Sequence, residues 1–61
     1  MIISEETPGV WIAVVPAPVT PVDLAALAEK LPAGVALATI EIDHDGKLYS
    51  SWEAPRVAPL D

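Results

Sequence analysis

The chain has 61 residues, of which 52% are hydrophobic, and its nine acidic and three basic side chains give a formal net charge of −6. This length allows a single domain. Because lysine and arginine are few and not clustered, we expect no binding to nucleic acid or to membranes, and the absence of cysteine excludes disulfides and thiolate zinc sites.

The small size of the chain sets the main functional expectation. A domain of this length buries only about 60% of the surface that its unfolded form exposes, so its own core is marginal. Small domains offset this weakness with disulfides, a structural metal or association with another chain. Since the first two are not expected here, we predict self-association or docking onto a larger protein assembly.

The N-terminal residues predict that the chain acts in the cytoplasm or inside a virion. Acidic residues follow Met1 closely and no positive charge precedes an apolar run, so secretion through a signal peptide is not expected. The longest apolar stretch, residues 9–19, is interrupted by Pro16 and Pro18. It is also shorter than the roughly 20 residues that a membrane-spanning helix requires.

Two strands are predicted in the first quarter of the chain. Ile2 and Ile3 form a short apolar start that suits an edge strand, and residues 4–9 are typical of a loop. Val10–Val15 is rich in β-branched and aromatic residues, which indicates a strand. Its residues do not alternate between apolar and polar, so we expect both faces to be covered, one of them by another chain.

A helix is predicted over residues 21–31, after an extended connector rich in proline. Thr20 suits the N-cap, Pro21 suits the first turn, and Asp23 stands where a capping-box carboxylate is expected. Pro32 ends the helix. The apolar stripe expected to pack against the sheet consists of Leu24, Leu27, Ala28 and Leu31.

Residues 35–43 and 47–53 predict a β-hairpin with a three-residue loop. A two-residue loop would pair apolar with polar residues, whereas the three-residue loop separates them onto two faces. It also gives Gly46 the left-handed bulge position. The expected apolar pairs are Ile42 with Leu48, Ile40 with Ser50 and Ala38 with Trp52; the polar pairs are Asp43 with Lys47, Glu41 with Tyr49 and Thr39 with Ser51.

These elements predict a small α+β fold of the (β)βαββ type, with one helix packed on a three- or four-stranded sheet. The connection through the helix is expected to be right-handed and to leave the strands that begin at Val10 and Val35 parallel. Residues 1–53 form the single domain in this prediction. Residues 54–61 form an extended C-terminal arm that contains two prolines.

No group of residues predicts an enzyme, a cofactor or a metal site. Glu41, Asp43 and Asp45 match the first, third and fifth positions of a calcium-binding EF-hand loop, but Trp52 occupies the twelfth, where a bidentate glutamate is required. Aspartate and glycine also suit a hairpin turn for conformational reasons. His44 has no adjacent nucleophile or orienting partner, so we expect an exposed histidine without a catalytic role.

The leading functional hypothesis is a non-enzymatic structural subunit of a larger assembly, such as a capsid-decorating or tail-associated protein of a phage virion. The alternative is a small acidic inhibitor or adaptor that masks a basic surface of a host protein through Glu41, Asp43 and Glu53. The partner is a protein in both cases. The residues predicted to contact it are Trp11, Ala13, Val15, Pro55, Val57 and Leu60.

Overall fold

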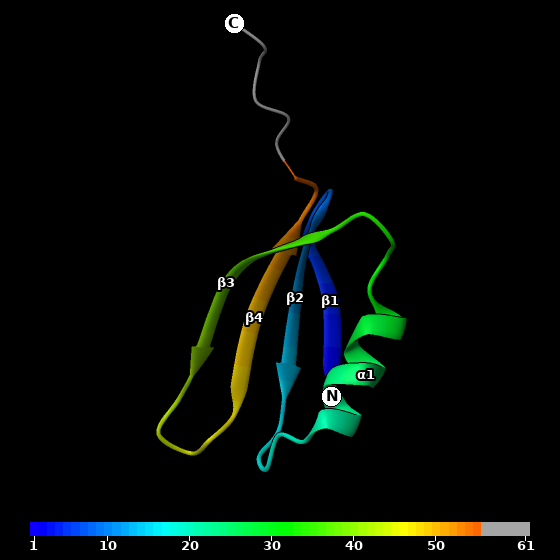
Figure 1. The fold of residues 1–61 in the computed structure, drawn as a ribbon. Helices are drawn as coiled ribbons and strands as arrows, with labels where there is room; N and C mark the ends of the chain where they lie inside the picture. Colours follow the sequence, from blue (N-terminus) through cyan, green and yellow to red (C-terminus); the bar gives the residue numbers. More distant parts are fainter. Residues whose placement is uncertain (56–61) are drawn as a thin grey trace, which may run out of the picture.

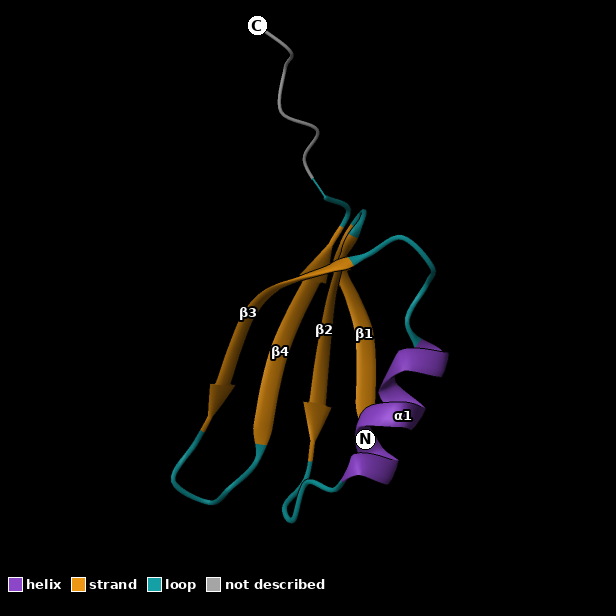
Figure 2. Ribbon diagram, viewed as in Figure 1, coloured by secondary structure: helices purple, strands orange, loops and turns teal. Residues whose placement is uncertain are grey.

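The computed structural model describes residues 1–55 and shows one helix on one face of a four-stranded antiparallel sheet (Figures 1 and 2). This confirms the small α+β fold. The elements in chain order are β1 (Ile2–Thr7), β2 (Val10–Val15), α1 (Pro21–Lys30), β3 (Ala36–Ile42) and β4 (Leu48–Glu53). The strand order in the sheet is β1-β2-β4-β3. Because β2 and β3 both run antiparallel to β4, they are parallel to each other, as expected, with β4 between them.

Strand β1 is longer than predicted, because it continues from the two isoleucines to Thr7. Its second half is polar, and its sequence predicts a loop instead. Antiparallel pairing with β2 extends through this half, with an irregularity between Glu5 and Thr7. A carboxylate oxygen of Glu5 accepts a hydrogen bond from the Gly9 backbone N–H at 3.0 Å and so helps to close the turn. Pairing with a strong neighbouring strand therefore outweighs the low strand propensity of these residues.

The start of α1 confirms the predicted capping box. The Thr20 hydroxyl accepts from the Asp23 backbone N–H, and the Asp23 carboxylate accepts from the Thr20 backbone N–H at 2.8 Å. The helix ends at Lys30, and Leu31 is its C-cap, donating its N–H to the Leu27 carbonyl at 3.1 Å. No helix within residues 1–55 is long and apolar enough to cross a membrane.

The loop of the β3–β4 hairpin has the predicted three residues. Asp43 donates its N–H to the Lys47 carbonyl at 3.0 Å, and its own carbonyl accepts from Gly46 at 2.9 Å. Gly46 has a φ of 84°, in the left-handed region. The segregation of apolar and polar residues therefore identified the correct loop.

The predicted register of this hairpin holds from the loop as far as the pair Thr39–Ser51 and then fails. Ala38 was expected opposite Trp52, but an irregularity at Ala38 brings Leu37 to that place instead. One extra residue in β3 keeps Leu37 on the same face as Ile40, because side chains directly opposite one another share a face of the sheet.

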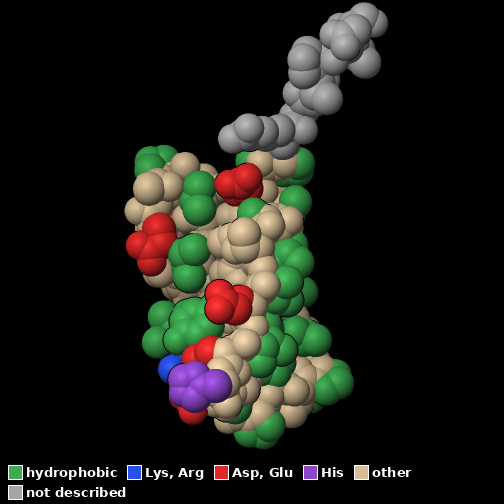
Figure 3. All heavy atoms as spheres, turned by 90° about the vertical axis from the view of Figure 1, so that its left-hand side faces the viewer, with side chains coloured by type: hydrophobic (Ala, Val, Ile, Leu, Met, Phe, Trp, Pro, Cys, Tyr) green, Lys and Arg blue, Asp and Glu red, His purple; other side chains and the backbone are tan. Residues whose placement is uncertain are grey.

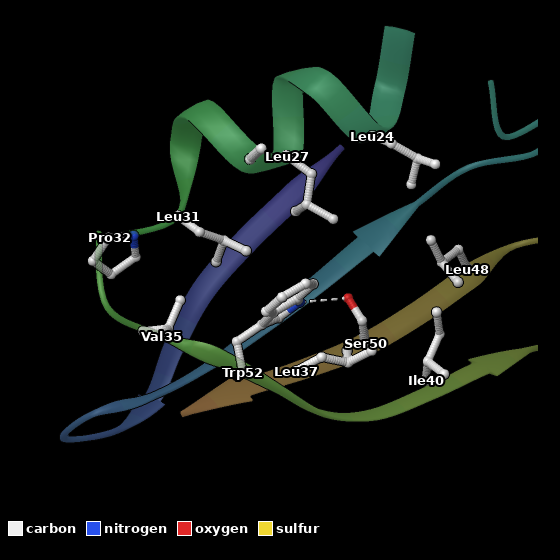
Figure 4. Close-up of a pocket in the computed structure, with 11 residues that line it drawn as sticks. Leu24, Leu27, Leu31, Pro32, Val35, Leu37, Ile40, Leu48, Ser50 and Trp52 are labelled. Atoms are coloured by element: carbon white, nitrogen blue, oxygen red, sulfur yellow. Dashed lines mark hydrogen bonds between the residues drawn. The ribbon is translucent and has the colours of Figure 1, made fainter. Parts of the chain in front are cut away.

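The core lies between α1 and the β1–β2 half of the sheet. Ala13, Leu27 and Leu31 form its buried cluster, and the side chains packed around them include Trp11 and Trp52, which pair directly across β2 and β4. Val15 and Leu48, which pair across the same two strands, are buried as well. Leu24 was also expected to be buried but is 49% exposed. The helix covers only part of the sheet, and Leu24 lies on the flank beyond that part (Figure 4).

Candidate functional site

An apolar groove of about 360 Å³ runs beside α1 on the helix-bearing face of the sheet (Figure 4). Strand β4 forms its floor through Leu48, Ser50 and Trp52. One wall is the flank of α1 that carries Leu24, and the other is β3 with Ile40. The groove therefore lies between elements that are far apart in the chain and is formed only when the hairpin docks beside the helix.

The wall formed by β3 exposes large apolar side chains. Leu37 is 46% exposed, Ile40 is 59% exposed and Ile42, which pairs with the groove residue Leu48, is 64% exposed. Hydrophobic side chains follow one side of the molecule in the view onto this edge, with carboxylates next to them (Figure 3). Contiguous apolar surface of this kind is a common mark of an interaction site.

The groove offers a polar ligand little to bind. Among the described lining residues, Ser50 and Trp52 carry the polar side-chain atoms, and both are already hydrogen-bonded. The Trp52 indole N–H donates to the Ser50 hydroxyl at 2.9 Å, and that hydroxyl donates to the Ala13 carbonyl at 3.4 Å. Small-molecule sites normally orient their ligand with a few polar groups. An apolar partner therefore fits this surface better than a polar metabolite.

The carboxylates at the hairpin tip are explained by the turn. Ligand atoms of Asp43, His44 and Asp45 lie within 4.8 Å of one another. However, one Asp43 oxygen accepts from the backbone N–H groups of Asp45 and Lys47, at 2.8 and 3.2 Å. The His44 Nε2 lies 3.5 Å from an Asp45 carboxylate oxygen, and the two side chains are 90% and 68% exposed. These contacts stabilise the loop, and none of these three side chains offers a buried ligand to a cation.

The residues predicted to contact a partner do not line this groove within the described part of the chain. Ala13 and Val15 are fully buried, so they are not available to a partner, and Trp11 is half-buried against the core. These odd-numbered residues of β2 lie on the same face of the sheet as α1, and Ala13 packs there with Leu27 and Leu31. Pro55 is exposed. Val57 and Leu60 lie outside the described residues.

The sequence did not indicate that Leu24, Leu37, Ile40 and Ile42 are exposed, although the hairpin pattern predicts Ile40 and Ile42 on its apolar face. The signal that identifies them is geometric. A helix of ten residues over a sheet of four strands leaves part of that apolar face without a cover.

No protein-family model, curated protein or solved structure matches this chain.

Proposed function

We propose that this chain is a non-enzymatic interaction subunit of a larger protein assembly. The observation that carries the proposal is the apolar groove, which leaves Leu37, Ile40 and Ile42 about half exposed or more in a chain with very little core. Covering such a surface releases water from apolar groups and so favours association. A docked partner would add the buried area that the small domain lacks.

The same surface supports a catalytic role less well than a binding role. The Ser50 hydroxyl is held by two hydrogen bonds within the chain, and His44 lies at the hairpin tip with its side chain almost fully exposed. A serine nucleophile requires a base within hydrogen-bonding reach. We therefore propose that the chain binds a partner and does not catalyse a reaction. A subunit of a phage virion, either capsid-decorating or tail-associated and located in the virion or the cytoplasm, is the context that we propose for it.

The test is the size of the complex that contains the chain in an extract of its native source. A structural subunit is expected to sediment far faster than a 6.4 kDa monomer. Ile40→Glu places a carboxylate in the apolar wall and should release the chain from the complex. Ile2→Glu is the matched control, because Ile2 is 68% exposed and lies away from the groove, and it should leave the complex intact.

A chain that sediments at its own mass in the extract would contradict this proposal. A compact complex with one partner would instead favour the acidic inhibitor or adaptor. Such a complex should dissociate at high salt and in a Glu41→Lys, Glu53→Lys variant, because its contacts would be electrostatic.

A further inference from the structure

The face of the sheet opposite α1 has a polar surface with one apolar stripe. Three strands alternate as expected for a sheet with one face in water, and they place hydroxyl groups beside Ile12 in one row across this face: Ser4, Ser51 and Thr39. Strand β2 does not alternate. Its odd-numbered residues lie on the face of α1, so Val10, Ile12 and Val14 form a stripe on the opposite face.

This stripe lacks a cover within residues 1–55. None of its three side chains is buried, whereas Ala13 and Val15 on the other face of the same strand are fully buried. Tyr49 pairs with Val14 and widens the stripe, and it is 38% exposed. Helix α1 packs on the other face of the sheet (Figure 2). The sequence predicts a cover on both faces of β2, and the structure supplies one.

Carboxylates lie beside the stripe on the side of β3. Glu41 pairs with Tyr49, and Glu53 pairs with Val10. Since side chains directly opposite one another share a face of the sheet, both glutamates lie on the same face as the stripe.

A further carboxylate lies on the side of β1. The Ser4 hydroxyl donates to a Glu6 carboxylate oxygen at 3.4 Å, which places Glu6 beside Ser4 on this face. Of the two described lysines, Lys30 belongs to α1, and Lys47 lies with its ammonium 5.8 Å from the ring centre of Tyr49. The stripe therefore has acidic residues on both sides and one lysine near the hairpin end.

We infer that this face binds one amphipathic α-helix of a protein partner, with apolar residues over β2 and lysine or arginine along both flanks. The stripe from Val10 to Val14 spans about 13 Å, which corresponds to about nine residues of a helix. Glu6 and Glu41 belong to the two edge strands, which lie three strand spacings or about 14 Å apart. A helix is about 10–12 Å wide, so basic side chains on its two flanks would reach these carboxylates.

A helix fits this face better than an extended segment. The central strands β2 and β4 are each paired on both sides, so their backbone groups are not available to a strand laid across the face. The backbone N–H and C=O groups of such a segment would lose water without gaining partners. A helix satisfies these groups internally and presents only side chains to the stripe.

The charges also argue against a second copy of this chain as the occupant. Two such faces in contact would bring together Glu6, Glu41 and Glu53 of each copy, with Lys47 as the one described lysine from each. Like charges in an interface disfavour association, whereas a basic helix would be attracted. The surface lies on the opposite face from the groove, so the inference goes beyond the function proposed for the groove.

The experiment uses a displayed library of helical peptides about 15 residues long, with leucine at positions i, i+3, i+4 and i+7 and the other positions randomised. Peptides selected on the full chain are expected to be enriched in lysine and arginine and to bind more weakly as sodium chloride is added. Ile12→Thr keeps a β-branched side chain but places a hydroxyl in the stripe, and it should weaken these peptides about tenfold.

Three further variants separate this surface from the rest of the molecule. A Glu6→Lys, Glu41→Lys variant changes exposed residues and should also weaken the peptides about tenfold or more. Ile40→Glu alters the groove and should leave the affinity unchanged. Ile2→Glu adds a carboxylate to edge strand β1 and should not weaken binding. Circular dichroism checks that each variant is folded.

The inference is overturned if no selected peptide is weakened by either Ile12→Thr or the double lysine variant. Peptides that lose affinity in Ile40→Glu but not in Ile12→Thr would bind the groove, and they would overturn it as well. So would a dimer of the chain that Ile12→Thr abolishes. Release of the native complex by Ile40→Glu tests the groove separately, so the proposed function and this inference can fail independently.

Discussion

Gly46 has two independent reasons to be glycine. Its φ of 84° is unfavourable for any residue with a Cβ, and a Cβ placed there would lie 3.2 Å from the Cβ of Ala17. Gly34 has a similar φ of 90° but nothing within 4 Å of such a Cβ. We expect Gly46→Ala to lower the free energy of unfolding by about 1–2 kcal/mol or more, and Gly34→Ala by less. Denaturant titration of both variants measures the difference, and equal losses would show that the contact with Ala17 adds nothing.

At the scale of elements, α1 carries one leucine that is buried and one that is exposed. Leu27 is 4% exposed and Leu24 is 49% exposed. Leu27→Ala should lower the free energy of unfolding by about 2–5 kcal/mol, because it leaves a cavity in the small core. Leu24→Ala should cost about 1 kcal/mol or less. Thermal unfolding followed by circular dichroism tests both, and similar losses at the two positions would mean that the groove is closed in solution.

The type and order of the elements could be predicted from sequence because their signals are local. Proline, threonine and aspartate define the start of α1, and the pattern of faces defines the hairpin loop. The length of β1 and the bulge at Ala38 depend on pairing with a neighbouring strand, which no local pattern reports. The groove depends on how far one helix reaches across a sheet of four strands. Periodicity predicted that Leu24 faces the sheet, but not that part of the sheet lies beyond the helix.

At the scale of the whole molecule, the described residues carry an excess of unpaired negative charge. Of the nine acidic residues, Asp61 lies outside the described part, which leaves eight against Lys30 and Lys47. Within residues 1–55 neither lysine forms an ion pair with a carboxylate, and the contact of His44 with Asp45 at the exposed hairpin tip joins opposite charges only when His44 is protonated. Folding therefore brings like charges together with little compensation from ion pairs, and this repulsion lowers the stability of the compact state.

Salt should consequently stabilise this fold. Sodium chloride screens repulsion between exposed carboxylates, since the Debye length falls from about 30 Å at 0.01 M to about 10 Å at 0.1 M. We expect a gain on the order of 1 kcal/mol, or about 4–8 °C in Tm for so small a domain. The rise in Tm should be the same at every protein concentration, because only a rise caused by association depends on concentration. A Glu6→Gln, Glu41→Gln variant has fewer repulsive charges to screen, so its Tm should rise less with salt. A Tm that falls as salt is added would mean that attractive pairs, rather than repulsion, dominate the electrostatics of the folded chain.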